Sequence, residues 1–428
     1  MGHLPSLPAR PCRVVASALA VGAVLLGSSA RHAPAQEAPP APALDPAELA
    51  DRFLGPVESY GGPGHVIVLI PRVAPGTATA TGEALAGRHG AELAAVWPIV
   101  ALDETCFVLR LDDGADAEAA SERVEAEDGV LLAYPIQEFD VVPGQTSADP
   151  EEPDGEVDPD APFAGEPLLA AQDALRAMRV DAAHAHVTGR GARVALIDTG
   201  VALDHPDLAG QPIEWRDYVR SDATALAPER HGTAMAALIA ADARNGVGMV
   251  GVAPDATVLA LRGCWEDDEG RGRCNTFSLA LALDYAVSDG APVVNLSLEG
   301  PSDPLLEALV GRAQEGGAVV LASKGKAEFP SGLPGVVAVA AEDGGGAGAD
   351  PEIRAPGVEV LGAEPEGGYD FFTGSSVATA HASGVAALLW SGDPDASAEA
   401  IREALLDGGP TLDACRSLDV LPVGPDCP

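Results

Sequence analysis

Lysine is almost missing from this 428-residue chain: it occurs only at Lys324 and Lys326, and the remaining Lys/Arg positions are all arginine. Positive charge is scarce altogether, since 25 Lys and Arg stand against 65 Asp and Glu, which gives a formal net charge of −40. A surface this acidic repels phosphate backbones, so we expect no nucleic-acid partner. Hydrophobic residues make up 47% of the chain, enough for a sizeable core, and the length suits two or three domains.

Long apolar runs are also missing, apart from one near the N-terminus. Val14–Leu26 is apolar and follows Arg10 and Arg13, but it is too short to span a bilayer comfortably. The Ala-Pro-Ala stretch at 33–35 is a small-x-small cleavage signal, which predicts a signal peptide over residues 1–35 and a secreted or periplasmic protein. The alternative is an uncleaved anchor. No cysteine follows the run directly, so a lipid anchor is not supported, and we expect no membrane contact after cleavage.

Cysteine is rare, with six in the whole chain. Cys12 would leave with the signal peptide, and no other cysteine lies close to Cys106 in the sequence. The other four form two closely spaced pairs, Cys264 with Cys274 and Cys415 with Cys427. In an exported protein this spacing predicts two local disulfides. The alternatives are free thiols or a metal site, and no histidine lies near either pair.

The first half of the chain reads as a small domain between two irregular segments. Residues 36–63 begin with an Ala/Pro-rich stretch and are expected to be a flexible lead-in. Residues 64–143 predict a small α+β unit of the split βαβ type. Its candidate elements follow the order β-α-β-β-α-β: His65–Ile70, Gly82–Gly90, Ala94–Leu102, Thr105–Leu111, Asp116–Glu127 and Val130–Tyr134. Residues 144–166 are rich in Asp, Glu, Pro and Gly and predict a disordered, acidic linker open to cleavage.

The second half, residues 167–428, alternates short apolar runs with helical stretches and shows no internal repeats. The apolar runs are typical of strands buried on both faces of a parallel sheet: Val194–Ile197, Thr257–Leu261, Pro292–Leu296, Ala318–Ala322 and Val336–Ala340. The helical stretches between them are Gly232–Asp242, Phe277–Ser288, Leu305–Glu315 and Ser376–Trp390. This pattern predicts a doubly wound α/β domain with helices on both faces of the sheet.

Three short motifs in this domain carry residues that suit nucleophilic catalysis. Asp198 ends an apolar strand, His231 opens a helix in His-Gly-Thr, and Ser376 opens another in Gly-Ser-Ser. A histidine can take the proton of a serine hydroxyl, and a carboxylate can orient that histidine. Backbone N–H groups at a helix start can face a developing oxyanion. Alone, each motif is a common cap, core or turn feature; their joint occurrence in this order is what points to catalysis.

The sequence around these motifs is similar to the subtilisin-like serine protease family (subtilases, peptidase family S8). The similar stretches are Asp198–Leu208, His231–Ala240, Gly374–Gly384, Gly251–Pro254 and Asn295–Leu298. The resemblance implies a subtilisin-like, mostly parallel sheet and a catalytic triad of Asp198, His231 and Ser376. It implies a secreted serine endopeptidase that acts through an acyl-enzyme at Ser376 and needs no cofactor for chemistry. It also implies a self-processing precursor whose ferredoxin-like pro-region inhibits it, peptide or protein substrates, and a monomer.

The substrate and oxyanion sites depart from the family pattern. Ser297, Leu298 and Glu299 match the strand that lines the first specificity pocket and pairs with the substrate backbone. The family usually has glycine where this chain has Glu299, which either biases the pocket toward basic or polar side chains or leaves Glu299 pointing to solvent.

The family asparagine that donates to the oxyanion is replaced, by our count along the chain, by Lys326, and Ser375 stands beside the nucleophile. The two lysines of the chain stand on either side of Gly325, and every other Lys/Arg position is arginine. We therefore expect the Lys326 ammonium to act as the oxyanion donor. The alternative is a catalytically impaired pseudoprotease that binds peptides or a partner protein. A ligase or transferase on the same fold is a third reading, since amines can also capture an acyl-enzyme.

The resemblance further implies a structural calcium ion. The implied ligands are Asp207, Asn245 and the backbone carbonyls of Ala243, Val247 and Met249, with Gln172 as a further candidate. Hard cations prefer such oxygen clusters. The alternative is that Asp207 caps a turn and that Asn245 adopts a left-handed conformation beside Gly246.

Overall fold

The computed structural model describes residues 57–60, 64–142, 145–146, 162–220, 223–342, 351–409, 411–422 and 427. The predicted signal peptide, most of the lead-in and most of the linker lie outside these residues. Within the described part of the chain, no helix combines the length and the apolar composition needed to cross a membrane.

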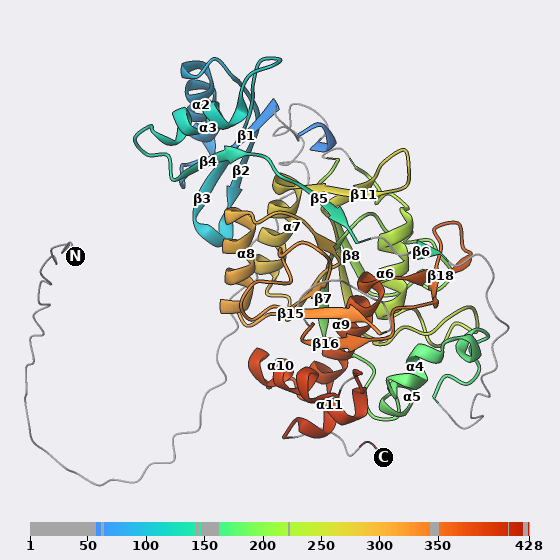
Figure 1. The fold of residues 1–428 in the computed structure, drawn as a ribbon. Coiled ribbons are helices and arrows are strands. Elements are labelled where there is room, and N and C mark those ends of the chain that lie inside the picture. Colours follow the sequence, from blue (N-terminus) through green and yellow to red (C-terminus); the bar gives the residue numbers. More distant parts are fainter. Residues whose placement is uncertain are drawn as a thin grey trace, which may run out of the picture. The chain divides into compact units, whose positions relative to one another are not determined.

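Residues 65–135 form a small α+β unit whose elements follow the predicted order (Figure 1). They are β1 (His65–Pro71), α2 (Pro75–Arg88), β2 (Glu92–Ile99), β3 (Glu104–Arg110), α3 (Ala117–Glu125) and β4 (Leu132–Pro135). The strands pair antiparallel in the order β2-β3-β1-β4. Helix α2 begins earlier than predicted because Pro75 suits the first helical position. Val100–Leu102 forms a 3-10 turn instead of ending a strand.

The segment predicted as a flexible lead-in contains a packed turn, Val57–Ser59. Val57 and Tyr60 are buried, and the Asn275 side-chain amide donates hydrogen bonds to their carbonyl oxygens at 2.9 and 2.7 Å. Residues 57–60 therefore belong to the packed structure. Their apolar side chains are too few to show a helical or strand period, so this turn could not be predicted from the sequence.

Seven strands build the central sheet, and every neighbouring pair is parallel. In spatial order they are β16 (Ile353–Ala355), β15 (Val337–Ala341), β14 (Val319–Ser323), β12 (Val293–Leu296), β7 (Arg193–Asp198), β9 (Thr257–Arg262) and β8 (Ile213–Asp217). This confirms the predicted doubly wound, mostly parallel α/β fold.

Helices cover both faces of this sheet. On one face, Val194 and Leu196 of β7 share a core with α6 (Arg230–Ala240), α9 (Ser375–Gly392), α10 (Ala398–Asp407), α11 (Ala414–Val420) and the short helices α4 (Asp173–Ala177) and α5 (Val180–Ala183). On the other face, Ala195 and Ile197 share a core with α7 (Thr276–Asp289) and α8 (Pro304–Glu315). The alternation along β7 is that of a strand buried on both sides.

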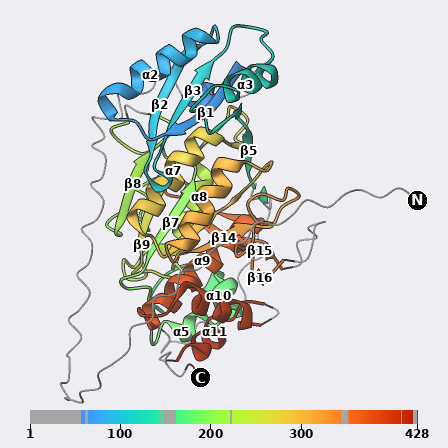
Figure 2. The same cartoon turned by 90° about the vertical axis from the view of Figure 1, so that its left-hand side faces the viewer.

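The small α+β unit packs against α7 and α8 (Figure 2). The Ala101 N–H donates to Asp284 of α7 at 2.7 Å, and the Tyr134 hydroxyl donates to Asp303, the N-cap of α8, at 2.8 Å. Burial raises the pKa of Asp284 to about 6. These contacts tie the α+β unit to the two helices.

Two small sheets then join the strands that follow the α+β unit to the α/β domain. One has the order β10-β11-β5-β13, with β10 (Cys264–Glu266), β11 (Gly272–Asn275), β5 (Glu138–Val141) and β13 (Leu298–Glu299). The other has the order β17-β18-β6, with β17 (Val360–Ala363), β18 (Tyr369–Thr373) and β6 (Gln145–Thr146). Figure 1 shows β5 alongside β11. Gln145–Thr146 and 162–166 lie in the segment predicted as a linker; β6 pairs through its backbone, which side-chain composition does not reveal.

Candidate active site

The predicted aspartate, histidine and serine lie at the carboxyl edge of the central sheet. Asp198 is the last residue of β7, and His231 and Ser376 are the second residues of α6 and α9, which contact each other. All three side chains are buried, and His231 Nδ1 lies 2.7 Å from Asp198 Oδ1. This is the edge at which open α/β sheets bind their ligands.

Gly232 lets α6 approach the end of β7 closely enough for this contact. A Cβ atom at Gly232 would collide with the carbonyl oxygens of Thr199 and Gly200. The Gly232 N–H donates to Thr199 Oγ1 at 2.9 Å. The glycine that follows the histidine is therefore part of what brings His231 to Asp198.

A buried ion-pair network fixes the start of α6. Arg262, 3% exposed at the end of β9, pairs with Glu229 at 2.6 Å and with Asp217 at 3.2 Å. Glu229 precedes α6, and its Oε2 also accepts the Gly200 N–H at 2.5 Å. Burial lowers the pKa of Arg262, but the two carboxylates more than offset this and the pKa is raised. Sequence reasoning missed this network because no fixed spacing links its members.

Glu266 of β10 is a second carboxylate that the motifs do not include. Its Oε1 accepts the His231 backbone N–H at 2.9 Å, one of the N–H groups left free at the start of a helix. Burial raises the pKa of the Glu266 carboxyl group. Glu266 therefore ties the catalytic histidine to the strand hairpin β10–β11.

Two reactive atoms of the site have no hydrogen-bond partner among the described residues: Ser376 Oγ and His231 Nε2. Because Nδ1 of His231 faces Asp198, Nε2 is the nitrogen that can accept a proton. Buried polar atoms are rarely left without partners, so an open donor and an open acceptor at one site indicate a place where a reacting group binds.

The predicted oxyanion donor Lys326 lies in the loop that follows β14. Its side chain is exposed, and the ammonium has no hydrogen bond or ion pair to a described residue. The backbone N–H groups of Lys326 and Ala327 donate to Glu299 Oε2 at 2.6 and 2.9 Å. Gly325 makes room for this carboxylate, since a Cβ there would collide with it. Glu299 is thus held by the backbone of this loop and does not simply point to solvent.

Ser375, the other predicted oxyanion residue, has a structural contact. Its hydroxyl donates to the Lys324 carbonyl oxygen at 3.0 Å, which ties the start of α9 to the loop after β14. Ser297 Oγ lies 3.4 Å from the Ser376 carbonyl oxygen and accepts from the Asn295 amide at 3.0 Å. The predicted substrate strand and the nucleophile helix are therefore linked directly.

Strand β5, which follows the small α+β unit, pairs with the predicted substrate-binding strand. Strand β5 pairs antiparallel with β11 on one side and with β13 on the other. Val141 faces Leu298, and the Val142 N–H donates to the Ser297 carbonyl oxygen at 3.1 Å. This is recognition by strand addition, in which backbone hydrogen bonds hold an extended peptide.

The side chains of β5 fill two pockets shaped by glycines. Phe139 and Val141 are 1% and 4% exposed. A Cβ at Gly300 would collide with the Phe139 ring, and one at Gly272 would approach Val141 Cβ to 2.5 Å. The Phe329 ring lies 5.6 Å from that of Phe139. The cleft therefore accepts apolar side chains at alternate positions of the bound strand.

Further along the chain, β6 pairs with β18, the strand that leads to the nucleophile. Gln145 faces Thr373 and Thr146 faces Phe372, and Ser376 follows three residues after the end of β18. Strands β5 and β6 thus pair with β13 and with the strand that precedes Ser376.

Both predicted disulfides are present. Cys264–Cys274 closes the hairpin of β10 and β11, and Cys274 is paired with Phe139 of the pro-region. Cys415 is joined to Cys427. Cys106 is a free, buried thiol whose pKa is raised by burial.

The loop predicted to bind calcium surrounds a buried carboxylate. Asp207 is 0% exposed, its Oδ2 accepts the Met249 N–H at 3.0 Å, and its Oδ1 accepts from Asn245 Nδ2 at 3.3 Å. Asn245 Oδ1, the predicted ligand atom, accepts the Val247 N–H at 2.8 Å. The carbonyl oxygens of Ala243, Val247 and Met249 accept no backbone hydrogen bond from a described residue. Since a buried carboxylate without a counter-charge is costly, this oxygen set fits a hard cation.

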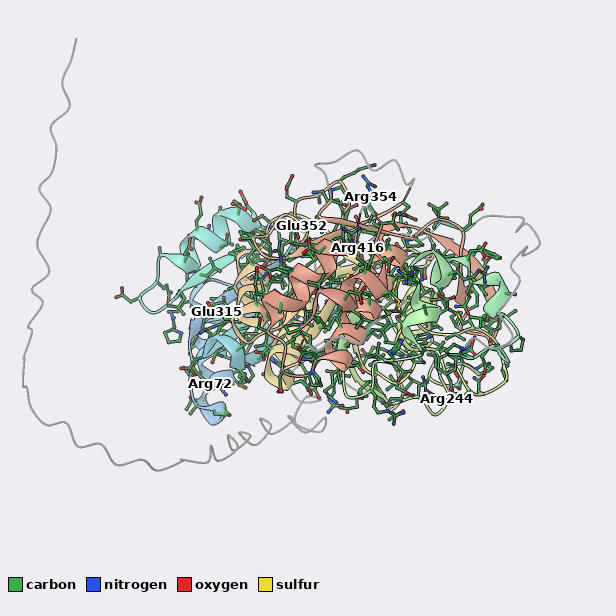
Figure 3. All side chains as sticks on the ribbon, turned by 90° about the horizontal axis from the view of Figure 1, so that it is seen from below. Arg72, Arg244, Glu315, Glu352, Arg354 and Arg416 are labelled. Carbon is green, nitrogen blue, oxygen red and sulfur yellow. A yellow bond between two sulfur atoms is a disulfide. The ribbon has the colours of Figure 1, made fainter. Side chains whose placement is uncertain are left out.

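Neighbouring side chains leave that position free of positive charge. Arg244 turns to the surface and pairs with Asp255 at 2.8 Å (Figure 3). Gln172 forms two hydrogen bonds of 2.8 Å with the backbone of Val250, so its amide is already engaged. The described residues contain no cluster of three or more His, Cys, Asp or Glu side chains suited to a metal, so a cation here depends on the Asp207 carboxylate and on backbone carbonyl oxygens.

The fold and the site together define an α/β serine peptidase with its triad in the order Asp, His, Ser. The model of the subtilase family matches residues 189–412. The chain is 36% identical to thermitase of Thermoactinomyces vulgaris, covering 49% of this chain and 78% of thermitase. It is 35% identical to subtilisin BL of Lederbergia lenta, covering 55% of this chain and 90% of that protein.

One solved structure supports the fold over a longer stretch. Fervidolysin from Fervidobacterium pennivorans, a keratinolytic enzyme related to subtilisin, aligns with a TM-score of 0.68 at 22% identity and covers 87% of this chain and 63% of its own. The chain therefore belongs to the subtilase family of serine endopeptidases, as its motifs predicted. Family membership implies that its substrates are peptides or proteins.

Proposed function

We propose that this chain is the precursor of an extracytoplasmic serine endopeptidase that removes its own pro-region. The observation that carries the proposal is the placement of β5 between β11 and β13, the position of a substrate strand beside the catalytic edge. The N-terminal signal sequence supports export, and two disulfides suit an oxidising compartment.

In this mechanism Ser376 Oγ attacks the carbonyl carbon of the scissile peptide while His231 Nε2 accepts its proton. Asp198 stabilises the imidazolium through Nδ1. The Ser376 N–H at the start of α9 and the Lys326 ammonium stabilise the oxyanion. The C–N bond then breaks as His231 returns the proton to the leaving amine. Water, deprotonated by His231, hydrolyses the acyl-enzyme and restores Ser376.

The bond cleaved in maturation lies between Val142 and Gln145. Among the described residues, Val142 is the last whose N–H bonds Ser297, directly before β13, and Gln145 is the first that pairs with β18. After cleavage the pro-region keeps its strand pairing and its docking contacts through Ala101 and Tyr134. It therefore acts as an inhibitor of the peptidase domain until it is displaced.

Expression of the full-length chain with Ser376→Ala tests this function. We expect the wild type to yield a mature fragment that begins at Pro143, Gly144 or Gln145, and the variant to remain intact. Ser302→Ala is the matched control, because Ser302 is an exposed serine that bonds Glu307 outside the site. Normal maturation of the Ser376→Ala protein in purified form would show that Ser376 does not perform the cleavage.

A second function has one observation in its favour. Glu299 binds the backbone of the loop in which the family places its oxyanion donor, and Lys326 stands there instead of asparagine. A catalytically impaired subtilase that binds peptides through β11 and β13 would show this departure. It would bind the pro-region strand without cleaving it, so the wild type would remain as intact as Ser376→Ala.

A calcium ion has a structural role in this proposal and takes no part in the chemistry. Asp207, Asn245 and the carbonyl oxygens of Ala243, Val247 and Met249 would hold it. The buried Asp207 carboxylate supports this assignment, because the ion would supply the missing counter-charge.

A further inference from the structure

Asp140 of the pro-region strand lies between two charged residues of the cleft. In β5, Phe139 and Val141 point inward, whereas Glu138 and Asp140 are exposed on the opposite face. Asp140 is directly opposite Arg273 of β11 and directly opposite Glu299 of β13. Side chains opposite each other in antiparallel strands lie on the same face and interact. The cleft therefore has one cationic and one anionic neighbour for this substrate position.

Of these two neighbours, Arg273 is the one that pairs with Asp140. The Glu299 carboxylate turns away to accept two backbone N–H groups, at 2.6 and 2.9 Å. The Arg273 guanidinium forms an ion pair with Asp140. It is held from the other side by Asp267, at 3.3 Å. Arg273 is thus oriented toward the bound strand by a residue of its own hairpin.

The hairpin keeps this orientation independently of the pro-region. Cys274, the next residue after Arg273, is joined to Cys264 across the hairpin. Asp267 is also fixed by Arg271, at 2.8 Å, which lowers the pKa of the Asp267 carboxyl group. Arg273 is therefore in place when a substrate strand replaces β5.

We propose that Arg273 is a specificity-determining residue that selects an acidic side chain in the substrate, two residues before the residue whose N–H binds the Ser297 carbonyl oxygen. This inference rests on the proposed peptidase function and names a substrate class for it. The preference is local, since the chain carries a net charge of −40 and its overall field opposes acidic ligands.

Peptide substrates test the assignment on the mature enzyme. The probes span the sequence of residues 138–146 with Asp, Asn or Lys in place of Asp140. Arg273 and Asp140 are both partly exposed, so we expect kcat/KM to be about three- to tenfold higher for Asp than for Lys. Arg273→Glu should reverse this order. Arg312→Glu is the charge-matched control and should preserve it, because Arg312 lies on α8 and pairs with Glu315.

A second peptide series, varied at the Glu138 position, separates this contact from overall charge. Glu138 faces Asn275, which is uncharged, so we expect kcat/KM to change less than twofold there. Equal Asp-to-Lys ratios in the wild type and in Arg273→Glu would overturn the assignment. A preference of the same size at both positions would also overturn it.

If no peptide is cleaved by any form, the proposed function fails, and the full-length Ser376→Ala protein then tests Arg273 alone. Asp140→Lys should increase amide hydrogen exchange across β5 by about three- to tenfold, and the charge swap Asp140→Lys with Arg273→Glu should restore protection. Unchanged exchange in Asp140→Lys, or no recovery in the swap, would refute the role of Arg273.

Discussion

A comparison of two disulfide variants can separate the effect of the β10–β11 hairpin disulfide on stability from its effect on substrate binding. Cys264–Cys274 and Cys415–Cys427 close loops with sequence separations of 10 and 12 residues. The chain-entropy relation then gives about 2.7 and about 2.8 kcal/mol of stabilisation, respectively. In the Ser376→Ala background, which prevents self-digestion, replacing either pair by serine should lower Tm by about 5–11 °C.

Only the first pair should affect substrate binding. Cys274 is paired with the bound strand, whereas Cys415 is the second residue of α11. Without its disulfide, the substrate must order the hairpin around residue 274; ordering one residue costs about 1–2 kcal/mol, so KM of the mature enzyme should rise about tenfold. Calorimetry and peptide kinetics measure the two effects. Equal KM values for the two disulfide variants would refute this reasoning, as would an unchanged Tm for both.

Three further predictions follow from the site and the core. Lys326→Ala should lower kcat at least about 100-fold with little change in KM or Tm, and Lys326→Asn should retain activity; wild-type turnover in Lys326→Ala would remove Lys326 from the oxyanion site. Chelation of calcium should lower Tm by about 5–10 °C in the wild type but not in Asp207→Ala, as melting curves with and without chelator would show. Burial lowers the pKa of His184 and His381 from 6.5 to about 4. As the pH falls, these two histidines are therefore protonated at a higher pH in the unfolded chain than in the folded chain. Stability should therefore be full above pH 6.5 and decline as pH falls toward 4, by up to about 3 kcal/mol per histidine, and His184→Gln should flatten the decline of Tm.

The catalytic residues could be predicted from the sequence because each sits in a short contiguous motif with a fixed local geometry. Asp198 ends a strand, and His231 and Ser376 begin helices, so strand and helix signals were enough to place them at one edge of the sheet. The buried network of Arg262, Glu229 and Asp217 could not be predicted, because its members come from different elements and meet only through tertiary packing.

The pairing of β5 and β6 in the cleft also could not be predicted from the sequence. Gln145–Thr146 lies in a stretch whose composition predicts a solvated linker, yet it pairs with β18 through backbone groups, which every residue type except proline offers as both donor and acceptor. Counting along the chain placed Lys326 near the oxyanion site, but a count does not give the direction of a side chain. The hydrogen bonds from Lys326 and Ala327 to Glu299 therefore had no signal in the sequence.

Labelling with a fluorophosphonate probe tests most directly whether Ser376 is an activated nucleophile. Mature wild-type protein should incorporate one probe, on Ser376, as peptide mapping would locate it. His231→Ala should abolish labelling, because His231 Nε2 is the proton acceptor in this account. Absence of labelling in the mature wild type, or labelling that survives in His231→Ala, would contradict the catalytic triad proposed here.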